Sequence, residues 1–199
     1  KSRMEPRMEQ TSSPNPTVSA AADAFAPGKF ESADVEKILR RNGWLASNRQ
    51  VEPEGALAAW IDRAALLIGT QSQTADELED LLRAVFEYDA VKVMQLRENQ
   101  AVLMREGARE VIRELANRVL EGGDIESDRL KEIVEALKIA TPYRSRELFQ
   151  PIRVALAGRA GEGGLDRVIL LLDAASRLDF ASPVKSARQR MIEFCAALD

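Results

Sequence analysis

The chain has 199 residues, of which 45% are hydrophobic and 30% charged, with a formal net charge of −4 and no histidine. This composition is typical of a soluble globular protein, and the length allows one domain or two small ones. The lack of histidine removes the commonest general base and metal ligand. A single cysteine excludes an intrachain disulfide and a cysteine-based zinc site.

Residues 1 to about 29 are rich in proline, serine, threonine and alanine and show no apolar period. We interpret residues 1–30 as a disordered or extended tail or linker. The longest apolar run, Val168 to Leu172, is far shorter than the roughly 20 residues of a membrane span, so we expect no membrane partner. Cysteine scarcity and the lack of a secretory signal lead us to expect a cytoplasmic location.

From residue 32 onward, apolar residues recur with the helical period, and no segment alternates like a half-buried strand. Glycine and proline punctuate the pattern. We predict an all-α helical bundle in which Trp44 and Trp60 belong to the core. The expected helices cover roughly 32–43, 53–69, 74–85, 90–96, 98–121, 127–141, 151–158, 165–178 and 183–195.

Two prolines and a glycine pair set particular helix ends in this prediction. Pro151 suits the first turn of a helix, where its missing amide costs nothing, and Ser182-Pro183 suits the start of the last helix in the same way. A single long helix runs from about Glu98 until Gly122-Gly123 stops it.

The end of that long helix and a change in charge place a domain boundary near residues 123–127. We predict two small consecutive helical subdomains, 31–125 and 126–199. Residues 138–199 carry ten basic against seven acidic side chains, a net +3, which leaves −7 for residues 1–137. The second part therefore offers the better phosphate-facing surface.

The stretch from Arg146 to Gly158 reads Arg-Glu-Leu-Phe-Gln-Pro-Ile-Arg-Val-Ala-Leu-Ala-Gly. It resembles the Leu-Phe-x-Pro-(Leu/Ile)-Arg-x-Ala-Leu-Thr-Gly segment in the C-terminal anticodon-binding region of bacterial glutamyl-tRNA synthetases. The basic run at 141–146 stands where that family has a lysine-rich one. Residues 86–90 and 98–103 resemble the helical linker of one branch of the family, so the resemblance covers about residues 57–199.

This sequence departs from the family pattern at several positions. Gln150 stands where a histidine is expected and Ala157 where a threonine is expected, and the basic run has arginines in place of lysines. Arginine keeps the charge but binds phosphate with a planar fork, whereas lysine acts as a compact point charge. The resemblance implies two helical anticodon-binding subdomains in series, tRNA as the partner (tRNA-Glu in particular) and a monomer.

Class I synthetases of this kind also resemble one another in a His-x-Gly-His-type signature and a Lys-Met-Ser-Lys-type loop, both of which contact ATP. Neither occurs here. The resemblance therefore implies an anticodon-binding part without the catalytic domain, and a chain that starts at Lys1 fits a fragment. ATP and glutamate would bind the absent catalytic domain. We expect no cofactor, no metal and no catalytic residue in this chain.

The candidate RNA-binding residues are Tyr143, Arg144, Arg146, Arg153, Arg159, Lys185 and Arg188. In the functional interpretation, the arginines on either side of Tyr143 grip anticodon-loop phosphates and the tyrosine stacks on an unpaired base. In the structural alternative, those arginines only cap the end of the preceding helix.

Each of the other candidates also has a structural alternative. Arg153 contacts RNA or pairs with a carboxylate such as Glu147, and Arg159 reaches RNA or complements the end of its helix. Three further cations, on the polar side of the last helix, contact RNA or are simply solvated: Lys185, Arg188 and Arg190.

Two rivals to tRNA recognition remain open. One is a degenerate synthetase relative that acts as a helical protein–protein interaction module, docking through its acidic N-terminal half. The other is an independent enzyme, which would need an activity without histidine, a cysteine metal site or a phosphate-binding loop.

Overall fold

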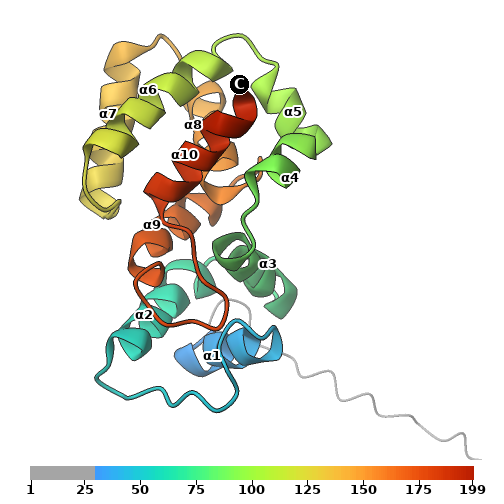
Figure 1. The fold of residues 1–199 in the computed structure, drawn as a ribbon, viewed down its shortest axis with the longest axis vertical. Coiled ribbons are helices and arrows are strands. Elements are labelled where there is room, and N and C mark those ends of the chain that lie inside the picture. The colour runs from blue at the N-terminus through green and yellow to red at the C-terminus, as the bar shows by residue number, and fades with distance from the viewer. Residues whose placement is uncertain (1–29) are drawn as a thin grey trace, which may run out of the picture.

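The computed structural model describes residues 30–199, and every regular element in this range is helical (Figure 1). The helices are α1 (Ser32–Arg41), α2 (Ala56–Ala64), α3 (Ala75–Phe86), α4 (Ala90–Gln95), α5 (Arg97–Leu103), α6 (Ala108–Glu121), α7 (Ser127–Ala140), α8 (Ser145–Ala157), α9 (Leu165–Ala175) and α10 (Ala187–Leu198). A short π-helical turn, η1 (Ala65–Gly69), continues α2. The predicted all-α fold is confirmed. The predicted tail, apart from Phe30, lies outside the described residues.

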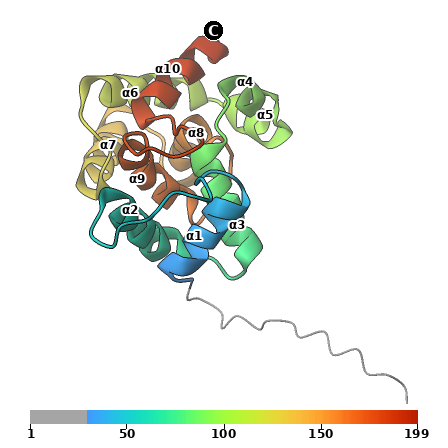
Figure 2. The same ribbon diagram turned by 60° about the horizontal axis from the view of Figure 1, so that its bottom comes forward.

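Helix α8 lies at the centre of the bundle and contacts α5, α6, α9 and α10 (Figure 1). Its apolar residues are buried: Leu148, Ile152, Val154, Ala155 and Leu156. Burying one leucine or isoleucine side chain contributes about 1.5–3 kcal/mol, so α8 is a main source of stability. In Figure 2, α7 lies on one side of α8 and α9, while α4 and α5 lie on the other. The division into subdomains 31–125 and 126–199 stays a prediction.

Four aromatic rings join the N-terminal helices to the connection between α9 and α10. Trp44 stacks on Phe86 with ring centroids 4.9 Å apart, and Phe180 meets Phe86 edge-on at the same distance. Trp60 meets Phe180 edge-on at 5.1 Å, and its indole nitrogen donates to the carbonyl of Leu171 at 3.1 Å. Both tryptophans are buried, which confirms their predicted place in the core.

The predicted long helix from residue 98 to 121 is wrong, because the chain forms two helices there, α5 and α6. Gly107 separates them with a left-handed backbone angle, φ = 81°. A side chain at this position would also meet the ring of Tyr143, since a Cβ built on Gly107 lies 1.9 Å from the tyrosine Cζ. Glycine therefore satisfies both the backbone angle and the close approach.

Two predicted helix starts are also wrong. Helix α8 begins at Ser145, so Pro151 lies inside it and leaves one carbonyl without its usual amide donor. The last helix begins at Ala187 and not after Ser182-Pro183. Its cap is Ser186, whose hydroxyl accepts a hydrogen bond from the amide of Gln189 at 3.2 Å.

Arg190 of α10 is fully buried, although its place in the sequence predicts a polar face. Its guanidinium donates to the carbonyls of Ala84 and Val85 at the end of α3, at 2.9 and 2.5 Å, and to that of Leu156 in α8, at 2.9 Å. It also lies 4.5 Å from the ring centroid of Tyr88. Burial lowers the pKa of Arg190 to about 10. Carbonyls at helix ends carry partial negative charge, which stabilises this cation without a paired carboxylate.

Candidate nucleic-acid interface

Arg144 ends the connection between α7 and α8, Arg146 lies in the first turn of α8, and both side chains are exposed. Nη1 of Arg144 donates to the carbonyls of Thr141, at 2.8 Å, and Tyr143, at 2.7 Å, so this residue caps the end of α7 as the structural alternative expects. The side chain of Arg146 forms no hydrogen bond or ion pair with another described residue. We call residues 141–146 the basic bend. Its charges face solvent and are not neutralised by an ion pair with any residue in the range 30–199.

Tyr143 of the basic bend is half-buried and rests on Gly107, at the start of α6. Burial raises the pKa of Tyr143, and the charges of Glu110 and Glu106 raise it further. The ring is thus fixed by packing and remains partly open to solvent. Such a ring offers a stacking platform at low entropic cost, because its orientation is already set.

Most of the segment that carries the family resemblance, from Leu148 onward, lies in the core. Gln150 of α8 is buried, and its amide exchanges two hydrogen bonds with Gly161: Nε2 donates to the glycine carbonyl at 2.9 Å, and Oε1 accepts from the glycine amide at 3.0 Å. A carboxamide both donates and accepts, so one residue satisfies both backbone groups of the turn. The structural role of this segment is therefore to hold α8 and the turn after it.

Arg153 belongs to the same arrangement. It forms a two-pronged ion pair with Asp166 of α9, with Nε–Oδ1 and Nη2–Oδ2 both at 2.8 Å, and Nη1 donates to the carbonyl of Gly161 at 2.8 Å. The hydrogen bond to Asp166 raises the pKa of Arg153. The side chain is 13% exposed. The carboxylate partner is Asp166 and not Glu147, and this packing leaves little of Arg153 for RNA.

Asn99 of α5 is a structural residue that the sequence analysis missed. It is buried, and Nδ2 donates to the carbonyls of Val93 and Gly158, at 2.9 and 3.0 Å. Its Oδ1 accepts from the amide of Ala160 at 2.7 Å. Asn99 therefore ties α4 and α5 to the turn that follows α8. One sequence signal could have indicated this role: Asn99 is a polar residue in the segment 98–103, which resembles the helical linker of the family.

Arg159 lies on that turn, half-buried and without an ion pair to a described residue. It borders a hollow of about 560 Å³ together with Arg83 of α3 and Lys92 of α4. The 13 residues of α8 span about 20 Å at 1.5 Å per residue. Arg159 and the basic bend therefore lie at opposite ends of α8 and do not form one contact point.

Lys185 and Arg188 are engaged elsewhere. The ammonium of Lys185 pairs with Glu193 at 2.6 Å, and it precedes α10 instead of lying on it. Arg188 is exposed but donates to the carbonyl of Leu120 at the end of α6. The seven predicted residues are therefore spread over several places, and only the three in the basic bend lie together.

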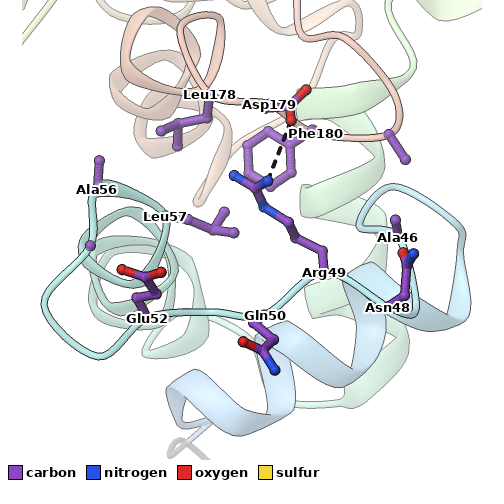
Figure 3. Close-up of a pocket in the computed structure, with 12 residues that line it drawn as sticks. Ala46, Asn48, Arg49, Gln50, Glu52, Ala56, Leu57, Leu178, Asp179 and Phe180 are labelled. Carbon is purple, nitrogen blue, oxygen red and sulfur yellow. Dashed lines mark ion pairs between the residues drawn. The ribbon is translucent and has the colours of Figure 1, made fainter.

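A further cleft, of about 780 Å³, lies between the α1–α2 connection and the α9–α10 connection (Figure 3). Arg49 reaches across it to Asp179, with 3.5 Å between Nη1 and Oδ2. Leu57 and Phe180 supply apolar wall, and Gln50 is one of its polar lining residues. None of the predicted RNA-binding residues lines this cleft.

Within residues 30–199, no group of three or more His, Cys, Asp or Glu side chains is placed to hold a metal ion. No helix of the described range has the length and apolar character needed to cross a membrane. The fold and the positions of the exposed arginines define a helical module that carries positive charge where its helices are connected.

The comparisons with known proteins identify the family of this module. A family model described as an anticodon binding domain matches residues 34–178, and the chain belongs to this family. The chain is 28% identical to a glutamate–tRNA ligase of Bacillus licheniformis over an alignment of 121 residues, which is 61% of the chain. It is 26% identical over 118 residues to glutamate–tRNA ligase 2 of Syntrophus aciditrophicus, which covers 59% of the chain. Both alignments cover 24% of the relative, about a quarter of its length. No solved structure matches the chain at a significant level.

Proposed function

We propose that this chain recognises the anticodon region of a tRNA as the anticodon-binding part of a glutamate–tRNA ligase. The observation that carries this proposal is the family match over residues 34–178, which includes the basic bend. The two ligase relatives support tRNA-Glu as the particular partner. In this role the chain acts in the cytoplasm as a monomer.

The mechanism we propose is positioning without chemistry at this site. Arg144 and Arg146 neutralise phosphates of the anticodon loop, and Tyr143 offers its open face to an unpaired base. Wrong bases are rejected because they leave buried polar groups without partners. ATP and glutamate bind a catalytic domain that corresponds to the unmatched part of the relatives, and no cofactor binds here.

A binding titration with two RNAs tests this proposal. The full 199-residue chain is mixed with tRNA-Glu and with the same tRNA carrying a changed anticodon, at two salt concentrations. We expect roughly tenfold weaker binding to the changed tRNA, which corresponds to about 1.4 kcal/mol. Both affinities fall with salt because phosphate contacts release counterions. Equal affinity for the two RNAs, or no binding at micromolar protein, contradicts the proposal.

A further inference from the structure

Three arginines follow one another at intervals of four residues where the chain enters α6: Arg105, Arg109 and Arg113. All three are exposed, and none of their side chains forms a hydrogen bond or ion pair with another described residue. Residues four apart lie one above the other on a helix, so Arg109 and Arg113 share one face of α6. Like charges in this arrangement repel each other and weaken the helix. We call these three residues the α6 stripe. A polyanion along the stripe would relieve the repulsion.

The carboxylates of α6 do not neutralise the stripe. Glu114 pairs with Arg118 at 2.7 Å, one turn further along the helix. Glu110 lies close enough to Tyr143 to raise the pKa of that residue. Glu106, in the connection before α6, is exposed. The stripe therefore stays a local excess of positive charge on a chain whose net charge is −4.

The α6 stripe is continuous with the basic bend. Arg105 and Arg146 line the same small crevice, together with Glu106 and Glu147. The ring of Tyr143 rests on Gly107, which lies between Arg105 and Arg109 in the sequence. The α5–α6 and α7–α8 connections both lie at the upper end of Figure 1, away from α1. Two segments far apart in the sequence thus meet on one surface, which carries the arginines of the stripe and of the basic bend together with Glu106 and Glu147.

We propose that the α6 stripe binds the phosphate backbone of the same RNA whose anticodon loop meets the basic bend. This inference rests on the proposed function and adds Arg105, Arg109 and Arg113 to the phosphate-binding residues. It assigns RNA contact to the part of the chain that carries a net negative charge. Phosphate contacts fix the register of a nucleic acid but do not read its sequence, so the stripe contributes equally for any anticodon.

The test compares two double variants of the full chain that each remove two positive charges. Arg109→Ala with Arg113→Ala clears the stripe, and alanine is a good helix former, so α6 is retained. Lys37→Ala with Arg49→Ala is the matched control, because both residues are exposed near α1, at the opposite end. We expect the stripe variant to bind tRNA-Glu about tenfold more weakly and the control to bind like the wild type. The slope of log affinity against log salt should fall by about 1.4, or about 0.7 for each lost phosphate contact.

The outcomes separate this inference from the proposed function. If the stripe variant weakens binding equally for tRNA-Glu and for the tRNA with a changed anticodon, the phosphate role is supported. If wild-type binding is strong and the stripe variant binds with unchanged affinity and salt slope, the stripe is not a contact surface while the proposed function stands. If the wild type itself does not bind tRNA, the proposed function is contradicted, and so is this inference, which rests on it. Circular dichroism of both variants checks that the helices are retained.

Discussion

Arg153 of α8 and Asp166 of α9 face each other through two parallel hydrogen bonds of 2.8 Å. The pair clamps the two central helices across the glycine-rich turn, where Arg153 also donates to the carbonyl of Gly161. This clamp gives the arginine of the family-like segment a role in the fold. Arg153 therefore maintains the structure, whereas the exposed Arg144 and Arg146 are the arginines proposed to bind RNA.

Removing the carboxylate of this clamp should destabilise the protein. Asp166→Asn leaves the guanidinium of Arg153, which is 13% exposed, without its charged partner. Hydrogen bonds to charged groups contribute about 1.5–3 kcal/mol, and we expect a loss of that size in the free energy of unfolding, measured with urea. Asp128→Asn is the control, because its ion pair with Lys131 is largely exposed and should contribute less than about 1 kcal/mol. Equal losses in the two variants would contradict the clamp.

The contact between Gly107 and Tyr143 predicts a linked change in stability and titration. Gly107→Ala places a Cβ against the tyrosine ring and strains a residue with φ = 81°. Gly43→Ala is the matched control, since Gly43 has φ = 72° but no atom within 4 Å of its Cβ position. We expect the control to lose about 1–2 kcal/mol from backbone strain alone, and Gly107→Ala to lose more.

The displaced ring should also titrate differently. Burial and the charges of Glu110 and Glu106 raise the pKa of Tyr143, so the pKa should fall toward the ordinary value of about 10 when the ring moves into solvent. Ultraviolet titration of tyrosinate measures this change. An unchanged titration curve together with a loss no larger than that of Gly43→Ala would show that the contact has no consequence.

Tyr88 predicts how stability depends on alkaline pH. Burial raises its pKa in the folded protein, so its contribution is complete below the unfolded value of about 10 and is lost as the pH rises above it. Its hydroxyl donates to the carbonyl of Ala155 at 2.7 Å. Tyr88→Phe should therefore cost about 1 kcal/mol at neutral pH but lose less stability than the wild type above pH 10. Parallel pH profiles of the unfolding free energy in the two proteins would contradict this.

Much of the fold could be predicted from apolar periodicity, but some features depend on contacts between distant segments. The end of α6 before Gly122 and the end of α8 before Gly158 follow from the sequence pattern. The break at Gly107 does not, because a lone glycine is tolerated inside a helix and its left-handed backbone angle becomes evident only in the folded chain. Pro151 predicts a helix start, yet packing around α8 holds it inside the helix. The burial of Arg190 could not be predicted, because the carbonyls that stabilise its charge belong to two other helices.

The candidate site was predictable only in part, for the same reason. The basic bend follows from a proline-marked connection between helices that is rich in arginine. The sequence does not show which cations form ion pairs within the protein. Lys185 pairs with Glu193, and Arg153 with Asp166, only once the helices are packed. The α6 stripe was missed because its residues lie in a segment whose net charge is negative.

The central claim is that the exposed arginines of the basic bend bind tRNA. It is tested most directly by titrating Arg144→Ala with Arg146→Ala against tRNA-Glu beside the wild type, with helicity checked by circular dichroism. We expect unchanged helicity, about tenfold weaker binding and a salt dependence reduced by about 1.4 in slope. Wild-type affinity and an unchanged salt slope in this double variant would contradict the account.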